Sequence, residues 1–557
     1  MNMDLRSPLL VELGSDRKDR NPRVPVFSGC KRLVESVRQA ASLCPWTGKD
    51  LSEIDPGSSS GAFASSYLKS TCFSKWNGGD RAGSDSRKAT AAARFAEAEA
   101  LCTNANRLLV DFESRCSLSA STRAILLRAR SIMDRLLGST VDLDEVVRRA
   151  GFGPGASTSL PRREASQQNK WDQGSHITEL ALPYYTAFRK WSAGVRLPDP
   201  EIVYHNEVVL VPKNSDTDRT IAIEPDWNMF FQKGVGGCIR SRLRRFGLLT
   251  PDAQNLHRRL AWEGSISGTL ATLDMSMASD TVSLGLVEAL VHPRWCRLLF
   301  DLRSKSGLFR TAARSQKWQN LAVSYAKISS MGNGYTFELE TALFYCLVLA
   351  ATGERLGSSR VSVYGDDIIC PANRAADVLE ALHEIGFKMN PSKSFSSGDF
   401  RESCGGHFWR GVNVTPFYVK TPLTTAISVI QLHNQVLAWH ARLGIRTLSE
   451  GWRQVVHGAR AVIPREFWGP WGCSENAIWS SFEEARPKWR KRYQSHAYWT
   501  VTKHDIQVSA QWTGSYVYKL WMEDTPELEA SWVTYPGARE RPSLVNRGQP
   551  GWDVPPV

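Results

Sequence analysis

The chain has 557 residues, of which 42% are hydrophobic and 22% are charged. These values exclude a mostly disordered or fibrous chain, and the length favours two or three subdomains over a single core. Lysine and arginine number 69 against 56 aspartates and glutamates, which gives a net charge of +13. This excess favours a polyanionic partner such as nucleic acid, but it does not identify a reaction.

Neither metal binding through cysteine pairs nor membrane insertion is indicated. The 11 cysteines are dispersed and include no CxxC pair, which excludes a zinc ribbon and a thioredoxin-type motif. The longest apolar stretch, Ala342–Ala351, has about half of the ~20 residues that a membrane span needs. The amino terminus lacks a secretory apolar segment. We therefore expect a soluble intracellular protein with reduced thiols and no membrane association.

The amino-terminal part predicts loops and helices. The first 85 residues mix serine, glycine, proline and charged residues, which indicates an arm with long loops. Apolar residues at three-to-four spacing predict amphipathic helices over Lys88–Leu109 and Ser119–Leu137. The β-branched segment Ile202–Pro212 predicts a strand that runs directly into the polar turn KNSDTDR.

The middle of the chain predicts a small sheet backed by helices. Between Thr269 and Lys393 the pattern alternates strand, helix, hairpin and helix, and the last helix covers Ala375–Ile385. Beyond about Arg401 the composition changes, because 12 of the 20 tryptophans lie there among basic runs. We therefore divide the chain into residues 1–200, 201–400 and 401–557.

Two adjacent acids are predicted at the tip of a hairpin. Val361–Cys370 reads VSVYGDDIIC, in which two apolar runs flank a tight turn that exposes Asp366 and Asp367. Neighbouring carboxylates repel each other, so a turn that keeps both needs a cation or solvent to neutralise them. An ordinary polar turn explains the same residues when they are taken alone.

A third acid makes a metal site the stronger interpretation. The run LATLDMSMASD predicts a strand that ends in Asp274, with Asp280 six residues later. If this strand pairs beside the hairpin, Asp274 and Asp366 can bridge two Mg²⁺ ions about 4 Å apart, as in phosphoryl transfer. One ion would lower the pKa of an attacking 3′-hydroxyl, and the other would hold the triphosphate and its leaving pyrophosphate.

Two further segments could bind a nucleotide. Ser329–Thr336 reads SSMGNGYT, a glycine-rich loop that enters a predicted helix over Phe337–Ala351. Its backbone and hydroxyls could contact sugar and template, although a flexible linker has the same composition. Lys213 and Arg219 flank the predicted turn, where they could meet a triphosphate or form a solvated charge cluster.

In this order, the motifs closely resemble the RNA-directed RNA polymerase, or replicase beta subunit, of the leviviruses, which are small single-stranded RNA phages. The resemblance covers roughly Val203–Tyr418 and rests on PKNSDTDR, IAIEPDWNMFFQ, LDMSMASD, SSMGNGYTFELE, VYGDDII and FRESCGGHFWRGVNVTPFY. The two spaced aspartates, the Gly-x-x-x-Thr loop and Tyr-Gly-Asp-Asp also look like the palm motifs A, B and C of positive-strand RNA polymerases. The implied fold is α+β, a right-hand polymerase with fingers, palm and thumb. Its palm would be a small antiparallel sheet backed by helices.

The resemblance also implies a role for each matching residue. It implies that the Mg²⁺ ligands, with Mn²⁺ as a substitute ion, are Asp274, Asp366, Asp367 and the backbone carbonyl of Met275. It implies that the residues binding the incoming nucleotide are Lys213, Arg219, Asp280, Ser330, Gly332 and Asn333. Among them, Asp280 looks like the motif A acid that helps to sense the ribose 2′-hydroxyl. Lys393 looks like the motif D lysine that protonates pyrophosphate, with Lys388 as a nearby competitor.

One residue departs from the wider positive-strand pattern. Four residues after Thr336, where many such polymerases carry asparagine, this chain has Glu340. Another side chain must then sense the ribose, and we predict Asn333 or Ser330. Asn333→Ala should therefore relax the preference for NTP over dNTP more than Glu340→Ala does.

Two alternative functions remain open at this point. A reverse transcriptase shares the palm and the paired aspartates, but Gly365 and Asp280 are atypical of one, since that class usually carries a bulky steric gate in place of the acid. A non-catalytic RNA-binding scaffold would explain the net charge. It would gain nothing from concentrating Asp274, Asp366 and Asp367 where RNA phosphate must lie.

Outside the motifs, the residues that could bind metal or RNA have simpler explanations. Cys404 and His407 make at most half a zinc site, and the tryptophans of the carboxyl-terminal region more often fill a core than stack bases. The basic run Arg486–Arg492 could contact RNA phosphates or be a solvated face.

The resemblance further implies partners and a location. They are RNA template and product, nucleoside triphosphates, the host elongation factors Tu and Ts, and a ribosomal small-subunit protein built of OB repeats. Synthesis would start without a primer in the cytoplasm of a bacterial host.

Overall fold

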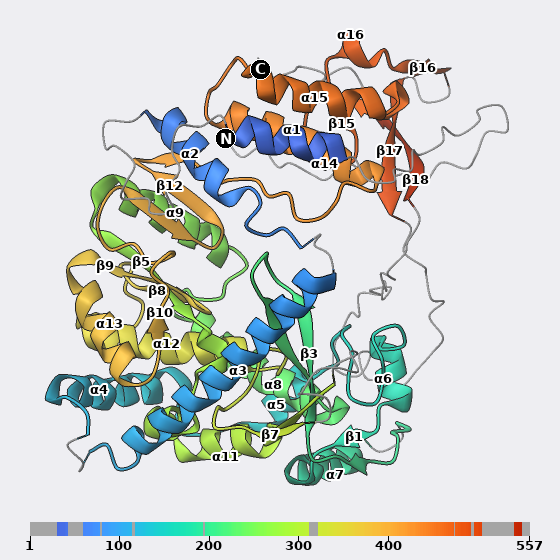
Figure 1. The fold of residues 1–557 in the computed structure, drawn as a ribbon. Coiled ribbons are helices and arrows are strands. Elements are labelled where there is room, and N and C mark those ends of the chain that lie inside the picture. Colours follow the sequence, from blue (N-terminus) through green and yellow to red (C-terminus); the bar gives the residue numbers. More distant parts are fainter. Residues whose placement is uncertain are drawn as a thin grey trace. The chain divides into compact units, whose positions relative to one another are not determined.

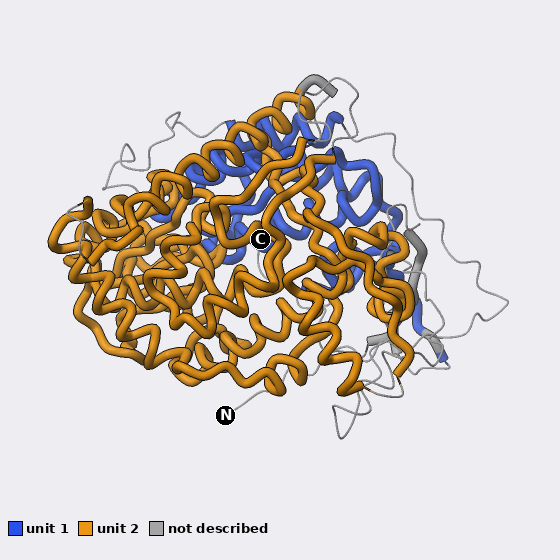
Figure 2. Tube along the Cα trace, turned by 90° about the horizontal axis from the view of Figure 1, so that it is seen from below, with its two compact units in different colours: residues 1–78, 413–506, 534–557 blue, residues 79–412, 507–533 orange. Residues whose placement is uncertain are grey.

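The structure is a computed structural model that describes residues 31–42, 59–77, 81–113, 117–192, 195–310, 321–472, 474–491, 495–503 and 540–547. It divides into two compact units (Figure 2). The larger unit is built on residues 79–412, and the second joins the chain before residue 79 to the chain after residue 412. The larger unit joins residues 79–200 to the middle of the chain, and the three ranges expected from the sequence stay a prediction. The names fingers, palm and thumb for those ranges stay a prediction.

The larger unit mixes helices and strands, which confirms the class predicted from the sequence. Its helices are α3 (Arg81–Leu109), α4 (Ala120–Leu137), α5 (Leu143–Arg149), α6 (Gln167–Gln173), η2 (Glu179–Ala181), α7 (Leu182–Trp191), α8 (Asp226–Arg244), α9 (Ala253–Ser267), η3 (Ala278–Asp280), α10 (Leu284–Leu290), α11 (Pro293–Leu302), α12 (Thr336–Thr352), η4 (Ala372–Arg374) and α13 (Ala375–Glu384). Its strands are β1 (His176–Ile177), β2 (Glu201–Ile202), β3 (Asn206–Pro212), β4 (Asp218–Ile223), β5 (Leu270–Ser276), β6 (Ser306–Phe309), β7 (Ala322–Ser324), β8 (Ser362–Tyr364), β9 (Asp367–Pro371), β10 (Lys388–Met389), β11 (Phe400–Ser403) and β12 (Gly406–Trp409).

A four-stranded antiparallel sheet, ordered β10-β5-β9-β8, carries the predicted acids. Side chains alternate between the two faces along a strand. Leu273 and Met275 of β5 therefore pack in the main core with α12, whereas Leu270 packs with Ile369 in a separate apolar cluster. By the same alternation, Asp274 lies on the face that Leu270 and Ile369 share.

The helix that follows the glycine-rich loop is buried almost throughout. α12 carries charge only at Glu338 and Glu340, and its remaining residues are apolar or small. A helix that is apolar on every side is stable only when other elements surround it. α12 packs against α4, α8, α13 and the sheet, which explains the apolar stretch that the sequence shows there (Figure 1).

The predicted helices of this unit are confirmed with small shifts at their ends. α3 includes the predicted helix from Lys88 but begins at Arg81. α4 begins one residue after Ser119, whose hydroxyl accepts a hydrogen bond from the Thr122 amide at 3.1 Å and caps the helix. α13 ends one residue before Ile385.

One predicted strand is wrong as a single element. The segment Ile202–Pro212 forms two strands, β2 and β3, which belong to different sheets. β2 pairs with β1, whereas β3 pairs with β4 and β6. The chain bends at Tyr204, whose side chain is 73% exposed, and the buried Asn206 side chain then donates a hydrogen bond to Glu224 at 2.8 Å. This hydrogen bond fixes the start of β3, so the segment bends although its β-branched residues favour one continuous strand.

The second unit is mainly helical in its described part. It contains α1 (Lys31–Ser42), α2 (Ser60–Thr71), α14 (Ala426–Arg442), α15 (Glu450–Val462), η5 (Arg465–Phe467), β14 (Trp468–Gly469), β15 (Ile478–Trp479), α16 (Phe482–Ala485), β16 (Lys488–Arg490), β17 (Ser495–Lys503) and β18 (Glu540–Arg547), and β13 (Val412–Asn413) lies at the boundary. Trp439, Trp452 and Trp468 are buried, as the packing interpretation predicts, whereas Trp489 is half exposed. Arg492 of the basic run lies outside the described residues. None of the described helices is both long and apolar enough to cross a bilayer.

Candidate active site

The sheet brings the predicted acids together. β5 and β9 are antiparallel neighbours in which Asp274 is directly opposite Asp367. Side chains of directly opposed residues lie on the same face, with Cβ atoms about 5 Å apart. Asp366 is at the tip of the β8–β9 hairpin and is exposed. Asp367, which the sequence places at the exposed tip, is instead the first residue of β9, where it pairs with both Tyr364 and Asp274. Its side chain is partly buried, with Ser403 and Cys404 in contact with its carboxylate.

The hairpin turn is held by the first turns of α12. Gly365 has φ +62°, and a Cβ at this position would lie 2.7 Å from a ring carbon of Phe337. The Gly365 amide donates a hydrogen bond to the Thr341 hydroxyl at 3.0 Å. Only glycine combines a positive φ with this close approach to Phe337 without strain. The conformation of the turn next to Asp366 therefore depends on Gly365 and on its contacts with α12.

The acids carry charge that the fold itself does not fully neutralise. Burial raises the pKa of Asp367 to about 6, and the neighbouring Asp366 adds to this effect. The pKa of Asp274 is also raised by burial, although Lys393 opposes the shift. Asp274 accepts a hydrogen bond from Asn390 Nδ2 at 2.8 Å. Acids that are buried near one another in this way favour a bound cation.

The donor set fits Mg²⁺ by chemistry. Three carboxylates supply the hard oxygen ligands that this ion prefers, and a divalent ion would relieve the repulsion between them. Among the described residues no three metal-binding side chains converge on one point. Mg²⁺ commonly takes one or two carboxylates and completes its shell with substrate phosphates and water, so an ion here would need the nucleotide.

The predicted lysine lies beside these acids, and its competitor does not. Lys393 Nζ is 3.5 Å from Asp274 Oδ2, whereas Lys388 is exposed and forms an ion pair with Glu97. Partial burial works to lower the pKa of Lys393, but the surrounding carboxylates, with Asp274 foremost, outweigh it and raise the pKa. Lys393 therefore stays protonated at neutral pH.

The predicted cations lie on the β3–β4 hairpin. Arg219 belongs to β4, and Lys213 follows β3 in the connecting loop. Burial and the positive charges of Arg219 and Lys393 lower the pKa of Lys213, while Asp366 opposes this. The loop therefore places Lys213 within electrostatic range of Asp366, with Arg219 nearby on β4.

The glycine-rich loop is docked on β4. The Ala222 amide donates to the Met331 carbonyl at 2.8 Å, and the Gly334 amide donates to the Gln232 side chain at 3.1 Å. Gly332 has φ +118°, and a Cβ there would lie 2.1 Å from the Ala222 carbonyl oxygen. The loop approaches the strand so closely that only glycine fits at this position.

Three polar atoms around this loop are buried without a hydrogen-bond partner in the described part of the chain. They are Ser330 Oγ, Asn333 Nδ2 and Glu340 Oε1. Asn333 Oδ1 accepts a hydrogen bond from the Tyr335 amide at 3.0 Å, which leaves the Nδ2 group as a free donor. Unsatisfied buried polar groups are costly, and they point to a ligand at this position.

Comparison with known proteins identifies the family. A family model described as RNA replicase, beta-chain, matches residues 33–531. The chain belongs to this replicase family. The RNA-directed RNA polymerase subunit beta of Enterobacteria phage SP is 41% identical over 387 residues, which make up 69% of this chain and 65% of that protein. The corresponding subunit of Escherichia virus Qbeta is 36% identical over 469 residues, or 82% of this chain and 76% of that protein.

Solved structures are more distant. The RNA-dependent RNA polymerase of BmCPV at its elongation state aligns with 62% of the replicase and 33% of that chain, at 12% identity and a TM-score of 0.39. The sequence relatives confirm the predicted resemblance and the prediction of an RNA-directed RNA polymerase. They argue against the reverse transcriptase and scaffold alternatives.

Several contacts of the replicase site were not found by sequence reasoning, which weighed Cys404 only as a zinc ligand. The Asp367 carboxylate lies 3.3 Å from the amide of Cys404 and 3.3 Å from the hydroxyl of Ser403. The buried His257 in turn lies 2.9 Å from Ser403 Oγ and 2.9 Å from Ser362 Oγ, and burial lowers its pKa to about 4. His257 is therefore neutral and structural. No spacing in the sequence connects these residues, because they meet only through the fold.

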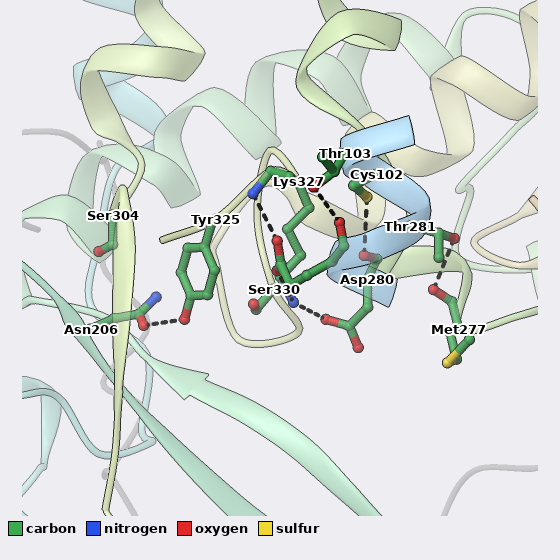
Figure 3. Close-up of polar contacts among 12 residues, drawn as sticks. Cys102, Thr103, Asn206, Met277, Asp280, Thr281, Ser304, Tyr325, Lys327 and Ser330 are labelled. Atoms are coloured by element: carbon green, nitrogen blue, oxygen red, sulfur yellow. Dashed lines mark hydrogen bonds and ion pairs between the residues drawn. The ribbon is translucent and has the colours of Figure 1, made fainter. Parts of the chain in front are cut away.

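Asp280, the second acid of the first motif, is bound by a lysine that sequence reasoning also missed. It lies in the short helix η3, and its Oδ1 atom is 2.8 Å from Nζ of Lys327 (Figure 3). The only signal for Lys327 in the sequence is its position three residues before Ser330.

Proposed function

We propose that the replicase copies RNA by two-metal nucleotidyl transfer at Asp274, Asp366 and Asp367. The observation that carries this proposal is the register that sets Asp274 opposite Asp367, next to the exposed Asp366. These acids would hold two Mg²⁺ ions, or Mn²⁺ in their place, with the carbonyl of Met275 as a further ligand. Bound there, the ions would activate a 3′-hydroxyl and stabilise the charge of the triphosphate.

The replicase's own cations act on the triphosphate. Lys213 and Arg219 would bind its phosphates through charge-assisted hydrogen bonds. Lys393, protonated and close to Asp274, would hold the proton that pyrophosphate takes as it leaves. Its ion pair with Asp274 keeps this proton near the acids until the nucleotide enters.

The ribose and base would lie against the glycine-rich loop. Asp280, Ser330 and Asn333 offer polar groups for the sugar, and Gly332 lets the backbone approach closely. Burial raises the pKa of Glu340 well above its ordinary value, and Asp366 and Asp280 add to the shift.

Asn333→Ala should relax the preference for ATP over dATP by about fivefold, the effect of one neutral hydrogen bond, and by more than Glu340→Ala does. The free Nδ2 donor of Asn333 is lost in the first variant, whereas Glu340 lies a turn further along α12. The measurement is the ratio of kcat/KM for the two nucleotides. Glu340→Gln, which keeps the side-chain volume, is the matched control, and equal effects of the two alanine variants would contradict the prediction.

The right-hand arrangement is part of the same proposal. The sheet with its acids would be the palm within residues 201–400, residues 1–200 would supply an arm and fingers, and residues 401–557 the thumb. Support comes from the antiparallel sheet backed by α12 and α13. RNA, nucleoside triphosphates, elongation factors Tu and Ts and an OB-repeat ribosomal protein would be its partners in the bacterial cytoplasm, with initiation independent of a primer.

Incorporation of labelled ribonucleotides on a cytidine-ended RNA template tests the function. The full chain should extend RNA with Mg²⁺, and omission of the template or addition of EDTA should abolish the signal. Parallel reactions with and without factors Tu and Ts test the partner proposal. A chain that binds RNA but incorporates nothing, even with both factors present, would show the proposal to be wrong.

A further inference from the structure

A fully buried lysine connects Asp280 to helix α3. The Lys327 side chain is 0% exposed, and its Nζ atom lies 2.8 Å from Asp280 Oδ1 and 3.2 Å from Glu99 Oε1. The ammonium group also lies 3.9 Å from the ring centroid of Phe95. A charge removed from water in this way is stable only with close partners, so the cluster has a defined geometry.

The backbone around Lys327 fixes where its side chain starts. Lys327 forms a β-bridge with Ser283, and the Ile328 amide donates to the Val282 carbonyl at 2.9 Å. Glu99 Oε2 accepts a hydrogen bond from the Ala326 amide at 2.7 Å. One carboxylate of α3 therefore holds both the backbone next to Lys327 and its ammonium group.

Asp280 uses only one of its two oxygens in this cluster. Its side chain is 14% exposed, and within the described residues no group donates a hydrogen bond to Oδ2. Figure 3 shows this second oxygen directed away from Lys327. An acceptor held in this way can discriminate between ligands that carry a hydroxyl and ligands that lack it.

The family resemblance already implies that Asp280 senses the ribose 2′-hydroxyl. We propose that Lys327 is a positioning residue for nucleotide selection, which fixes the Asp280 carboxylate so that Oδ2 is available to that hydroxyl. The inference rests on the proposed function. Glu99 holds Lys327 in place and has no direct role. A deoxynucleotide lacks the hydroxyl, so its incorporation does not depend on this contact.

Lys327→Met removes the charge and keeps most of the side-chain length over Phe95. The efficiency of ATP incorporation, measured as kcat/KM on an RNA template with the full chain and factors Tu and Ts, should fall about tenfold or more, as expected for one hydrogen bond to a charged group. The efficiency for dATP should change less than about threefold, so that the ATP to dATP ratio falls. Glu99→Gln keeps a side-chain oxygen that can accept from Lys327 and leaves the ion pair between Lys327 and Asp280, so it should keep the wild-type ratio.

A purely structural role makes a different prediction. If Lys327 only connects α3 to the sheet, ATP and dATP incorporation should fall together in Lys327→Met, and this result would overturn the inference. Lys327→Met leaves the carboxylates of Glu99 and Asp280 without their lysine, which could prevent folding. In that case the double variant Lys327→Met, Glu99→Gln removes one of these two charges. Its ATP to dATP ratio then tests the inference in the same way. If the wild type incorporates neither nucleotide, the proposed function itself is wrong, and the inference is overturned with it.

Discussion

Asp274→Asn should reduce ribonucleotide incorporation by roughly a thousandfold or more, because several kcal/mol of metal-based stabilisation of the transition state would be lost. Asparagine keeps the shape of the side chain, and its amide oxygen can still accept the hydrogen bond from Asn390. The variant therefore removes charge and little else. Single-nucleotide extension at saturating Mg²⁺ and ATP measures the effect. Asp377→Asn, which changes a half-buried acid of α13 paired with Arg374, is the matched control and should leave extension unchanged.

The same substitution should stabilise the metal-free protein. Burial raises the pKa of Asp274 above its ordinary 3.8, and Asp366 adds to this against Lys393, so the ionised carboxylate costs folding free energy at neutral pH. The variant should therefore melt at a higher temperature than the wild type at pH 8 with EDTA. This gain should shrink as the pH falls through the raised pKa toward 3.8, since the wild-type acid then becomes neutral in the fold. A variant that loses both activity and stability at pH 8 would instead indicate a structural defect.

The sequence contains enough information for the local elements of this site. The apolar stretch of α12, the hairpin around Gly365 and the strand that carries Asp274 are all predicted correctly, because each depends on contiguous residues with a clear period or turn signal. The order of the motifs, through the family resemblance, then predicts that Asp274, Asp366 and Asp367 lie together in one palm. Their exact register, with Asp274 opposite Asp367, follows only from the folded sheet.

The parts that sequence reasoning missed depend on contacts between distant segments. Lys327 meets Glu99, which lies far earlier in the chain, and no local pattern distinguishes this lysine from a solvated one. The break between β2 and β3 similarly depends on Asn206 reaching Glu224. Asp367 is less exposed than its turn sequence suggests, since Ser403 and Cys404 from a distant segment contact its carboxylate. Such features arise from tertiary packing, which overrides local propensity.

Gly332→Ala should reduce incorporation by about a hundredfold or more, since backbone strain and a steric clash act together on the loop that holds Ser330 and Asn333. The new Cβ would lie 2.1 Å from the Ala222 carbonyl oxygen, far inside van der Waals contact. Ala222 lies within β4, whose pairing with β3 prevents the strand from moving away. The loop must therefore shift instead. The rate of single-nucleotide extension and the KM for ATP measure the consequence.

Gly357→Ala separates the two causes. Gly357 has φ +82°, similar in sign to Gly332, but no atom lies within 4 Å of a Cβ built there. This control carries only the backbone cost of about 1 kcal/mol and should extend RNA like the wild type. If Gly332→Ala is as active as the wild type, the loop tolerates displacement from β4. The contact between the loop and β4 would then not determine the position of the Asn333 side chain. A selective loss in Gly332→Ala means that the spacing between the loop and β4 determines where the nucleotide binds.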